Sequence, residues 1–311
     1  SHSPQPNILV DFDGTGGPAQ CGINLTKEGT LASVYWALKG IIALDVPVNA
    51  GFHRTIRVVA PENCIVNPLP PSPVGARYET VTLVVDVILG ALSQALPHKA
   101  IAASHGVHGI GFAGRGSRHY IYYETVGGGT GGASIKDGVD CYHNVSNLPV
   151  EAAELAYPLQ VERLEYIPDS DGAGTFRGGL GVRKDWRILA DSYINTHSLR
   201  HTIHPQGFNG GHEAPVCRII LNANTPNETL LPREATLIEV NPGDVVTVLP
   251  PGGGGFGPPE ERTPEKVLLD YLNGKLSLER ARHVYRVAID IETEQVDHEE
   301  TQRLRQQLAG S

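Results

Sequence analysis

The sequence predicts a mixed α/β fold in which two core helices pack on mixed sheets, and three observations support it. Apolar residues recur every three to four positions in two stretches, about 28–44 and 79–96, as in helices with one buried face. Elsewhere apolar and polar residues alternate, most clearly in 159–166, as in a half-buried strand. Three short strands near 216–250 predict a β-rich module, and a short helical segment follows it.

In the N-terminal third, prolines mark where the expected elements end. Pro47, Pro61 and Pro97 each follow an apolar stretch, and proline cannot continue a helix or a central strand because it lacks an N–H group. We expect a strand at 8–12, a helix at 28–44, a strand at 55–60, a proline-rich connector at 68–73 and a helix at 79–96.

Beyond residue 100 the chain alternates glycine-rich loops with short strands. We expect strands at 119–124, 159–166, 182–189, 192–198, 216–222, 235–240, 244–249 and 285–290. Thr263 and Pro264 are suited to the first positions of a helix, and further helices are expected at 277–283 and 299–308. The predicted parts are a glycine-rich α/β core over 1–215, a β-rich module over 216–260 and a helical segment over 261–311.

Composition excludes several classes of protein. The 311 residues are 40% hydrophobic and 19% charged, as in a globular protein with a core. A net charge of −9 argues against nucleic acid as a partner, because binding to phosphates requires lysine and arginine. No apolar run approaches eighteen residues, no signal peptide is recognisable, and the four cysteines form no CxxC pair. We therefore expect a cytoplasmic protein without a membrane partner.

Two histidines are candidate metal ligands. His105 and His108 are three residues apart, which on a helix would place both imidazoles on one face. The glycines around them argue against a helix, so the alternative is that they are ordinary loop histidines.

Carboxylates next to glycine turns are candidate acids or bases. Glu124 precedes a tract of glycines, and Asp169 opens a segment with five glycines and Arg177. General acids and bases are commonly held at such positions, but aspartate beside glycine is also a frequent turn pair. The tracts 127–132 and 252–257 could cradle phosphate through backbone N–H groups, or they could serve tight packing. The residues alone leave both alternatives open.

Several long motifs in a fixed order carry a resemblance. They are VDFDGTGGPAQ (10–20), YYETVGGGTGG (122–132), PVEAAELAYPLQVERLEY (149–166), DSDGAGTFRGGLG (169–181) and PGGGGFGPPEER (251–262). Together they resemble the hydantoinase B/5-oxoprolinase family over essentially the whole chain. Members of that family are longer at the N-terminus, so the chain is expected to correspond to the C-terminal portion of a B-type subunit.

The resemblance implies a function. Family members act with a hydantoinase A-type subunit that binds ATP and Mg²⁺, and the hetero-oligomer hydrolyses cyclic amides such as hydantoin, 5-oxoproline or lactams through a phosphorylated intermediate. A divalent metal of unknown identity is also expected. One alternative is a subunit of an ATP-dependent, biotin-independent carboxylase of acetone or acetophenone. The other is a non-catalytic scaffold half of a B-type subunit.

With the resemblance in place, we expect catalytic roles for Glu124 and Asp169, with Arg177 and Arg77 positioning an anion. The expected substrate-binding residues are Asn24 and the glycines Gly127, Gly128, Gly129, Gly178 and Gly179. His105 and His108 remain the candidate metal ligands.

Overall fold

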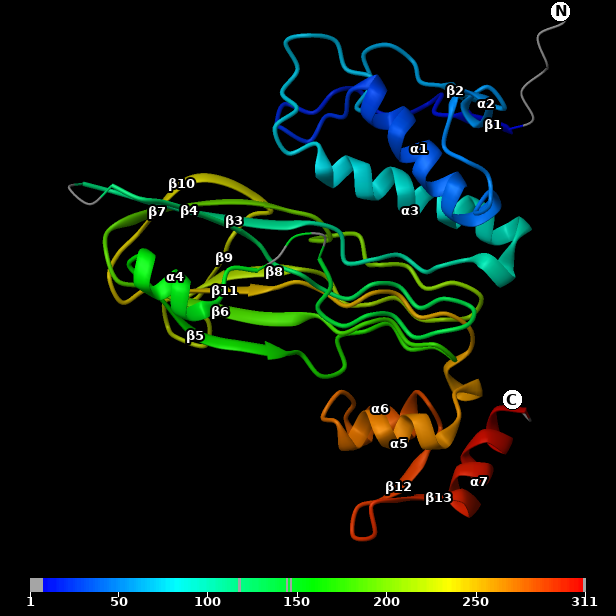
Figure 1. The fold of residues 1–311 in the computed structure, drawn as a ribbon. Helices are drawn as coiled ribbons and strands as arrows, with labels where there is room; N and C mark the ends of the chain where they lie inside the picture. Colours follow the sequence, from blue (N-terminus) through cyan, green and yellow to red (C-terminus); the bar gives the residue numbers. More distant parts are fainter. Residues whose placement is uncertain (1–7, 117–118, 144, 146, 310–311) are drawn as a thin grey trace, which may run out of the picture. The chain divides into compact units, whose positions relative to one another are not determined.

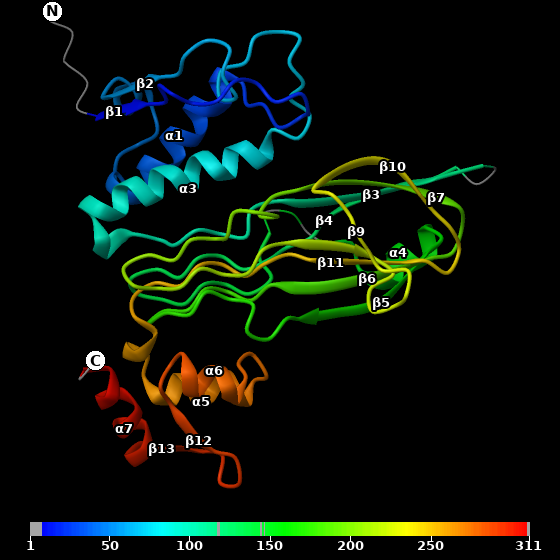
Figure 2. The ribbon, with the colours of Figure 1, turned by 180° about the vertical axis from the view of Figure 1, so that it is seen from behind.

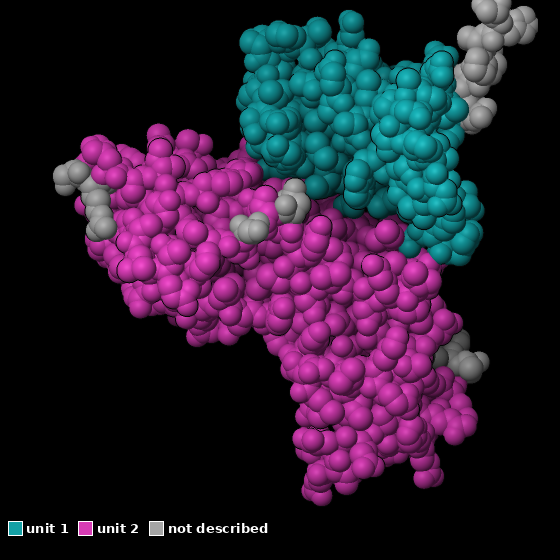
Figure 3. All heavy atoms as spheres, in the orientation of Figure 1, with its two compact units in different colours: residues 1–100 teal, residues 101–311 magenta. Residues whose placement is uncertain are grey.

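The chain forms two compact units, residues 1–100 and 101–311 (Figure 3). The computed structural model describes residues 8–116, 119–143, 145 and 147–309. Its mixture of helices and sheets confirms the predicted fold class. The expected boundaries at 215 and 260 do not coincide with these units, because strands from both sides of residue 215 pair in the same sheets.

The first unit packs two helices beside a small parallel sheet. Its elements are β1 (Ile8–Asp11), α1 (Lys27–Ile42), α2 (Ala50–His53), β2 (Ile56–Val59), α3 (Tyr78–Ala95) and the 3-10 turn η1 (Pro97–Lys99). The Thr26 side chain accepts from the Gly29 N–H group and so caps α1. Leu38 of α1 and Val84 and Ile88 of α3 share one buried cluster, which confirms the two predicted core helices.

Among the described residues, α3 is long and apolar enough to span a membrane by length and composition alone. The core helix of a soluble protein passes the same test. Val84 and Ile88 of α3 pack in one buried cluster with α1, and 28% of the helix is buried.

The second unit contains a two-layer β-sandwich (Figure 1). One sheet has the order β10-β7-β3-β4, and the other has the order β5-β6-β11-β8-β9. Phe112, Trp186, Ile194 and Val246 come from both sheets and lie in one buried cluster. The strands are β3 (His108–Gly114), β4 (Ile121–Thr125), β5 (Leu159–Tyr166), β6 (Val182–Ile188), β7 (Ser192–Ser198), β8 (Arg218–Leu221), β9 (Thr229–Leu230), β10 (Glu234–Val240) and β11 (Val245–Leu249). Helix α4 (Val150–Ala156) precedes β5.

Beyond the sandwich, six extended segments run side by side without forming a sheet, as both ribbon views show (Figures 1 and 2). We call them the glycine bundle, made of 101–106, 126–132, 137–142, 170–181, 204–212 and 251–257. The amides of four consecutive residues, 252–255, donate to the carbonyls of Ser170, Gly179, Ala103 and His212. Hydrogen bonds that radiate to several neighbours are expected of three-residue-per-turn extended chains, which make none internally.

A C-terminal segment packs against the glycine bundle. It contains η2 (Pro259–Glu261), α5 (Pro264–Leu272), α6 (Leu278–His283), β12 (Ala288–Asp290), β13 (Gln295–Asp297) and α7 (His298–Ala309). Thr263 occupies the predicted position before α5 but makes no side-chain cap, whereas the Ser277 side chain caps α6. Ala173 of the bundle lies in one buried cluster with Val267, Leu276 and Tyr285.

Candidate functional site

Close backbone packing, rather than an unusual backbone conformation, explains the glycines of the bundle. A Cβ atom on Gly129 would lie 1.9 Å from the Gly179 carbonyl oxygen, and one on Gly178 would lie 1.9 Å from that of Gly253. Neither Gly129 nor Gly178 has a φ in the left-handed region, although Gly106, Gly210 and Gly257 at the ends or turns of bundle segments do. Any side chain at Gly129 or Gly178 would therefore overlap a neighbouring backbone.

The predicted substrate-binding glycines lie inside this packing. Cβ atoms on Gly127 and Gly128 would meet the Tyr142 and Pro251 carbonyl oxygens at 3.0 and 2.5 Å, and one on Gly179 would meet that of Val139 at 2.0 Å. The structure therefore brings the glycines of 127–129 and 178–179 together, and their lack of side chains allows backbone to pack directly against backbone. Their role in binding substrate stays a prediction.

A group of histidines lies where the bundle meets the sandwich. His105 lies near the end of the first bundle segment, Gly106 follows with a φ of +88°, and β3 begins at His108. The imidazole of His143 lies near that of His105, with ring centres 6.0 Å apart. We call His105, His108 and His143 the histidine cluster. His143 comes from a segment whose sequence offers no reason to expect such a partner.

His108 is fully occupied by hydrogen bonds. Its Nδ1 atom lies 2.6 Å from the Ser198 hydroxyl and its Nε2 atom lies 3.0 Å from the His105 carbonyl oxygen. Ser198 in turn contacts the Cys217 thiol, whose pKa burial raises to about 12. Both nitrogens of His108 thus have protein partners, and its role as a metal ligand stays a prediction.

His105 differs from His108 in having one nitrogen without a partner. Burial lowers the pKa of His105 to about 3, helped by the neighbouring His143 and Arg200 and opposed by a hydrogen bond to the Tyr142 backbone. Its Nδ1 atom is buried and has no hydrogen-bond partner among the described residues, and the same holds for Nδ1 of His143. Burial also lowers the pKa of His143.

Glu124 projects into the sandwich, where it forms a buried ion pair. Lys184 of β6 donates to both carboxylate oxygens at 2.6 and 2.8 Å, and Tyr122 donates its hydroxyl hydrogen to the same carboxylate. The Lys184 ammonium also lies 4.9 Å from the centre of the Trp186 ring. Burial and the neighbouring Glu124 raise the pKa of Tyr122. These contacts account for Glu124 without a ligand, so its catalytic role stays a prediction.

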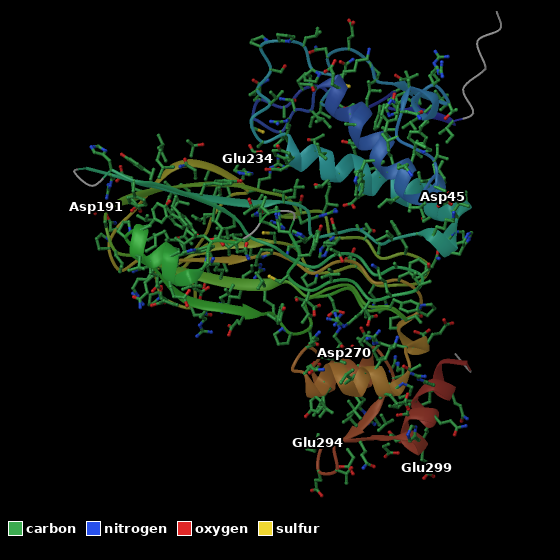
Figure 4. The ribbon with its side chains drawn as sticks, in the orientation of Figure 1. Asp45, Asp191, Glu234, Asp270, Glu294 and Glu299 are labelled. Carbon is green, nitrogen blue, oxygen red and sulfur yellow. The ribbon has the colours of Figure 1, made fainter. Side chains whose placement is uncertain are left out.

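Arg177 joins the glycine bundle to the C-terminal segment. Its guanidinium pairs with Asp140 at 3.0 Å and with Asp270 of α5 at 3.1 Å. Arg262 pairs with Asp270 and with Asp137 in the same group. Figure 4 shows Asp270 on the side of α5 that faces the extended segments. Despite burial, these carboxylates raise the pKa of Arg177. Arg177 therefore binds two protein carboxylates, and a role in positioning a substrate anion stays a prediction.

Asp169 has a similar connecting role. Its φ of +59° places it in the left-handed region, and its carboxylate accepts from the Ser277 N–H group at 2.9 Å, just before α6. The backbone carbonyl of Asp169 accepts from the Arg280 guanidinium. The position of Asp169 thus fixes the start of α6 against the bundle. Its predicted catalytic role is not tested by this arrangement.

Two predicted site residues belong to the first unit. Asn24 is fully buried, and its amide bonds the backbone of Ala19, Cys21 and Pro73, which ties the proline-rich connector to the loop before α1. Arg77 immediately precedes α3, and its guanidinium lies 4.7 Å from the centre of the Tyr78 ring. Their proposed contacts with substrate stay predictions.

The histidine cluster holds two buried ring nitrogens without hydrogen-bond partners among the described residues, and other buried side chains, such as Asp171 and Tyr285, also have an unpartnered atom. Within residues 8–116, 119–143, 145 and 147–309, no group of three or more His, Cys, Asp or Glu side chains is placed to hold a metal ion. His105 and His143 offer neutral imidazoles that can accept a proton or bind a cation. Arg177 and Glu124 are already paired with protein groups of opposite charge.

Comparison with known proteins shows which family this chain resembles. The model of the hydantoinase B/oxoprolinase family matches residues 3–259. The putative D-/L-hydantoinase B subunit of Pseudomonas sp. (strain NS671) is 34% identical over 313 aligned residues, which cover 96% of this chain and 52% of that protein. The chain thus spans about half the length of this curated relative.

Two solved structures share the fold. The ATP-dependent caprolactamase of Pseudomonas jessenii matches with a TM-score of 0.81 and 26% identity, over 96% of this chain and 54% of the other. A nucleotide-free acetone carboxylase matches with a TM-score of 0.80 and 18% identity, over 97% of this chain and 46% of the other. The second likeness is one of fold alone.

Proposed function

The chain belongs to the hydantoinase B/oxoprolinase family, and we propose that it acts as the B-type subunit of an ATP-dependent enzyme that opens cyclic amides. The observation that carries this proposal is the 34% identity to a hydantoinase B subunit across 96% of the chain. The likeness to an ATP-dependent caprolactamase supports the same reaction class. Candidate substrates are hydantoin, 5-oxoproline and lactams.

In this proposal, ATP and Mg²⁺ bind mainly to an A-type partner subunit, where the γ-phosphoryl group is transferred to the amide oxygen of the ring. Water then attacks the activated carbon, the C–N bond breaks to release the amine and leave an acyl phosphate, and a second water hydrolyses the acyl phosphate to carboxylate and phosphate. The relative is named as a B subunit, which supports a hetero-oligomer. We place the reaction in the cytoplasm, where ATP is abundant.

Within this chain, the glycine bundle would serve as a rigid support. Its backbone hydrogen bonds fix the segments that carry His105 and His143, while Arg177 and Asp169 fasten the C-terminal segment to it. A support of this kind suits a reaction that must exclude bulk water from a phosphorylated intermediate. The scaffold alternative shares this arrangement but assigns no chemistry to the chain.

The test is turnover by the assembled complex. The full-length protein is co-produced with its A-type partner and supplied with ATP and, separately, hydantoin, 5-oxoproline, caprolactam, or acetone with bicarbonate. We expect ring-opened product and phosphate in equal amounts with at least one cyclic amide. Product formed only from acetone, and only with bicarbonate, would instead establish the carboxylase alternative.

A variant at Arg77 tests whether this residue takes part in the reaction. Arg77 is exposed and pairs with no carboxylate among the described residues, so Arg77→Ala should leave folding unchanged. If Arg77 positions an anion, kcat/KM of the complex falls by about tenfold or more. Unchanged kcat/KM in Arg77→Ala removes this residue from the site, and absence of turnover with every cyclic amide contradicts the proposed function.

A further inference from the structure

In the C-terminal segment, α7 lies beside the start of α5, as both ribbon views show, and a cavity opens to solvent between them (Figures 1 and 2). Its volume of about 480 Å³ is in the range of small-molecule sites. It is lined by the first residue of α5 and by one face of α7, which are Pro264, His298, Thr301, Gln302, Arg305 and Gln306. This cavity lies beyond residues 3–259, which the family model matches.

Arg305 brings a positive charge to the cavity without a counterion among the described residues. One terminal nitrogen of its guanidinium donates to the carbonyl oxygens of Arg262 and Tyr285, at 2.7 and 3.5 Å. The other, Nη1, has no hydrogen-bond partner among the described residues and, unlike the buried Nε, is not hidden from solvent. Carbonyl oxygens are neutral, and arginine stays protonated in proteins, so the charge is not balanced.

Neighbouring arginines of the same helix pair show what Arg305 lacks. Arg282 of α6 and Arg303 of α7 each lie 2.7 Å from the Glu300 carboxylate. The hydrogen bond to Glu300 raises the pKa of Arg303, whereas burial lowers the pKa of Arg305. The charge of Arg305 is thus partly withdrawn from water with no carboxylate in compensation, a situation that an anionic ligand would relieve.

The other side chains of the cavity are suited to an anion. None of the described residues that line it is an aspartate or glutamate. Gln302 and Gln306 are exposed amides, each with two N–H donors. Glu260 and Glu265 lie close enough to favour the charged form of Arg305, but neither pairs with it or lines the cavity. These two acids weaken the attraction for an anion without occupying its place.

We propose that this cavity binds a small molecule through a carboxylate or phosphate group held by Arg305. The two groups share the anionic oxygens that a guanidinium recognises, and Nη1 is free to donate to them. Gln302 and Gln306 donate to the remaining oxygens, while Pro264 forms an apolar wall for the rest of the ligand. The inference does not rest on the proposed ring-opening activity.

The experiment titrates the full chain with inorganic phosphate and, separately, with succinate, at constant ionic strength, and follows binding by calorimetry. We expect saturable binding of about one anion per chain, and Arg305→Gln should weaken it by about tenfold or more. Arg303→Gln removes the same charge from the same helix, but from an exposed side chain that does not line this cavity, so it should leave the affinity unchanged.

Arg305→Lys is the conservative variant. It keeps the positive charge but lacks the planar set of N–H donors, so its affinity should fall between those of wild type and Arg305→Gln. A merely structural role of Arg305 in holding the Arg262 carbonyl would leave the affinity for anions the same in all folded variants.

A second measurement uses the wild-type chain, because loss of the contact with the Arg262 carbonyl could loosen α7 in a variant. In ¹H–¹⁵N spectra, the anion should saturably shift the side-chain amides of Gln302 and Gln306, and sodium chloride at the same ionic strength should not. Binding of phosphate alone or of succinate alone supports the proposal and identifies the preferred group. Equal affinity in wild type and folded Arg305→Gln, shifts confined to residues outside the cavity, or no saturable binding of either anion would overturn it.

Discussion

At the scale of single residues, burial determines what the charged groups of this chain do. The side chains of Lys184 and Glu124 are 3% and 5% exposed, and their pair sits inside the sandwich. Arg187 and Glu162 form a pair on the same sheet, but their side chains are 38% and 31% exposed. An exposed pair gains little over hydration, whereas breaking a buried pair leaves one charge without water or partner.

This contrast predicts that removing the lysine of the buried pair lowers the free energy of unfolding more than removing the arginine of the exposed pair. Lys184→Met should lower the free energy of unfolding by about 3–5 kcal/mol, because Glu124 keeps a buried charge without its counterion. Arg187→Ala should lower it by only about 0–1 kcal/mol. Urea unfolding of both variants measures the difference. A double variant, Lys184→Met with Glu124→Gln, should recover part of the loss; failure to recover any would show that the charge is not the cause.

The histidine cluster predicts that stability depends on pH. The pKa of His105 is about 3 in the folded chain and near 6.5 when unfolded, so between these values the unfolded chain binds more protons. Folding is therefore favoured less as pH falls below 6.5. Between pH 7 and pH 5, His105 alone should remove about 2 kcal/mol from the free energy of unfolding.

Urea unfolding at the two pH values measures this loss. His108, whose pKa burial also lowers, contributes in the same direction. Histidine NMR spectra should show His105 still neutral at pH 5. A His105 resonance that titrates near pH 6.5 would contradict burial as the structural cause.

The sequence identifies some of these residues but cannot identify their partners. Glu124 and Arg177 are notable in the sequence because they stand beside glycines, and both prove to be buried and charged. Their partners Lys184 and Asp270 lie 60 and 93 residues away in the chain. Neither stands in a recognisable motif, so only the fold shows that the pairs exist. The same holds for His143 beside His105.

At the scale of elements, local patterns predict the helices well and the glycine segments poorly. The expected helices at 28–44 and 79–96 agree with α1 and α3 to within two residues at each end. Strand β3 is missed because three of its seven residues are glycine, which strands rarely contain. At Gly109 the reason is visible, since a Cβ atom would overlap the His197 ring and the Tyr123 hydroxyl.

The bundle predicts that its glycines cannot be replaced. Gly253→Ala would place a Cβ atom 2.0 Å from the Thr130 carbonyl oxygen, and backbone on both sides prevents relief of the overlap. We expect a loss of more than about 4 kcal/mol or failure to fold. Gly111→Ala in β3 is the control, because its nearest neighbour would be at 3.6 Å, and it should change stability by about 1 kcal/mol or less. Soluble yield and urea unfolding test both; equal stability would contradict the packing argument.

At the scale of the whole molecule, the division of the chain could not be found from local sequence. The expected boundary at 215 lies where short strands succeed one another. In the structure β10 pairs with β7 and β11 pairs with β6, so strands beyond 215 complete sheets begun before it. By its contacts the chain divides after Ala100, where the helix-rich unit has its own buried cluster. The division of the chain depends on strands that pair although they are distant in sequence, and no local sequence pattern predicts those pairs.

Separate cores predict separate unfolding transitions. Leu38 lies in the buried cluster of the first unit and Ile194 in that of the second, with exposures of 2% and 0%. Truncating either side chain to alanine leaves a cavity, which should lower the free energy of unfolding by about 2–5 kcal/mol. If each unit folds around its own core, Leu38→Ala should lower the midpoint of one calorimetric transition and Ile194→Ala that of another. A single transition that both substitutions lower equally would show instead that the two units unfold together, and that their coupling exceeds the stability of either core.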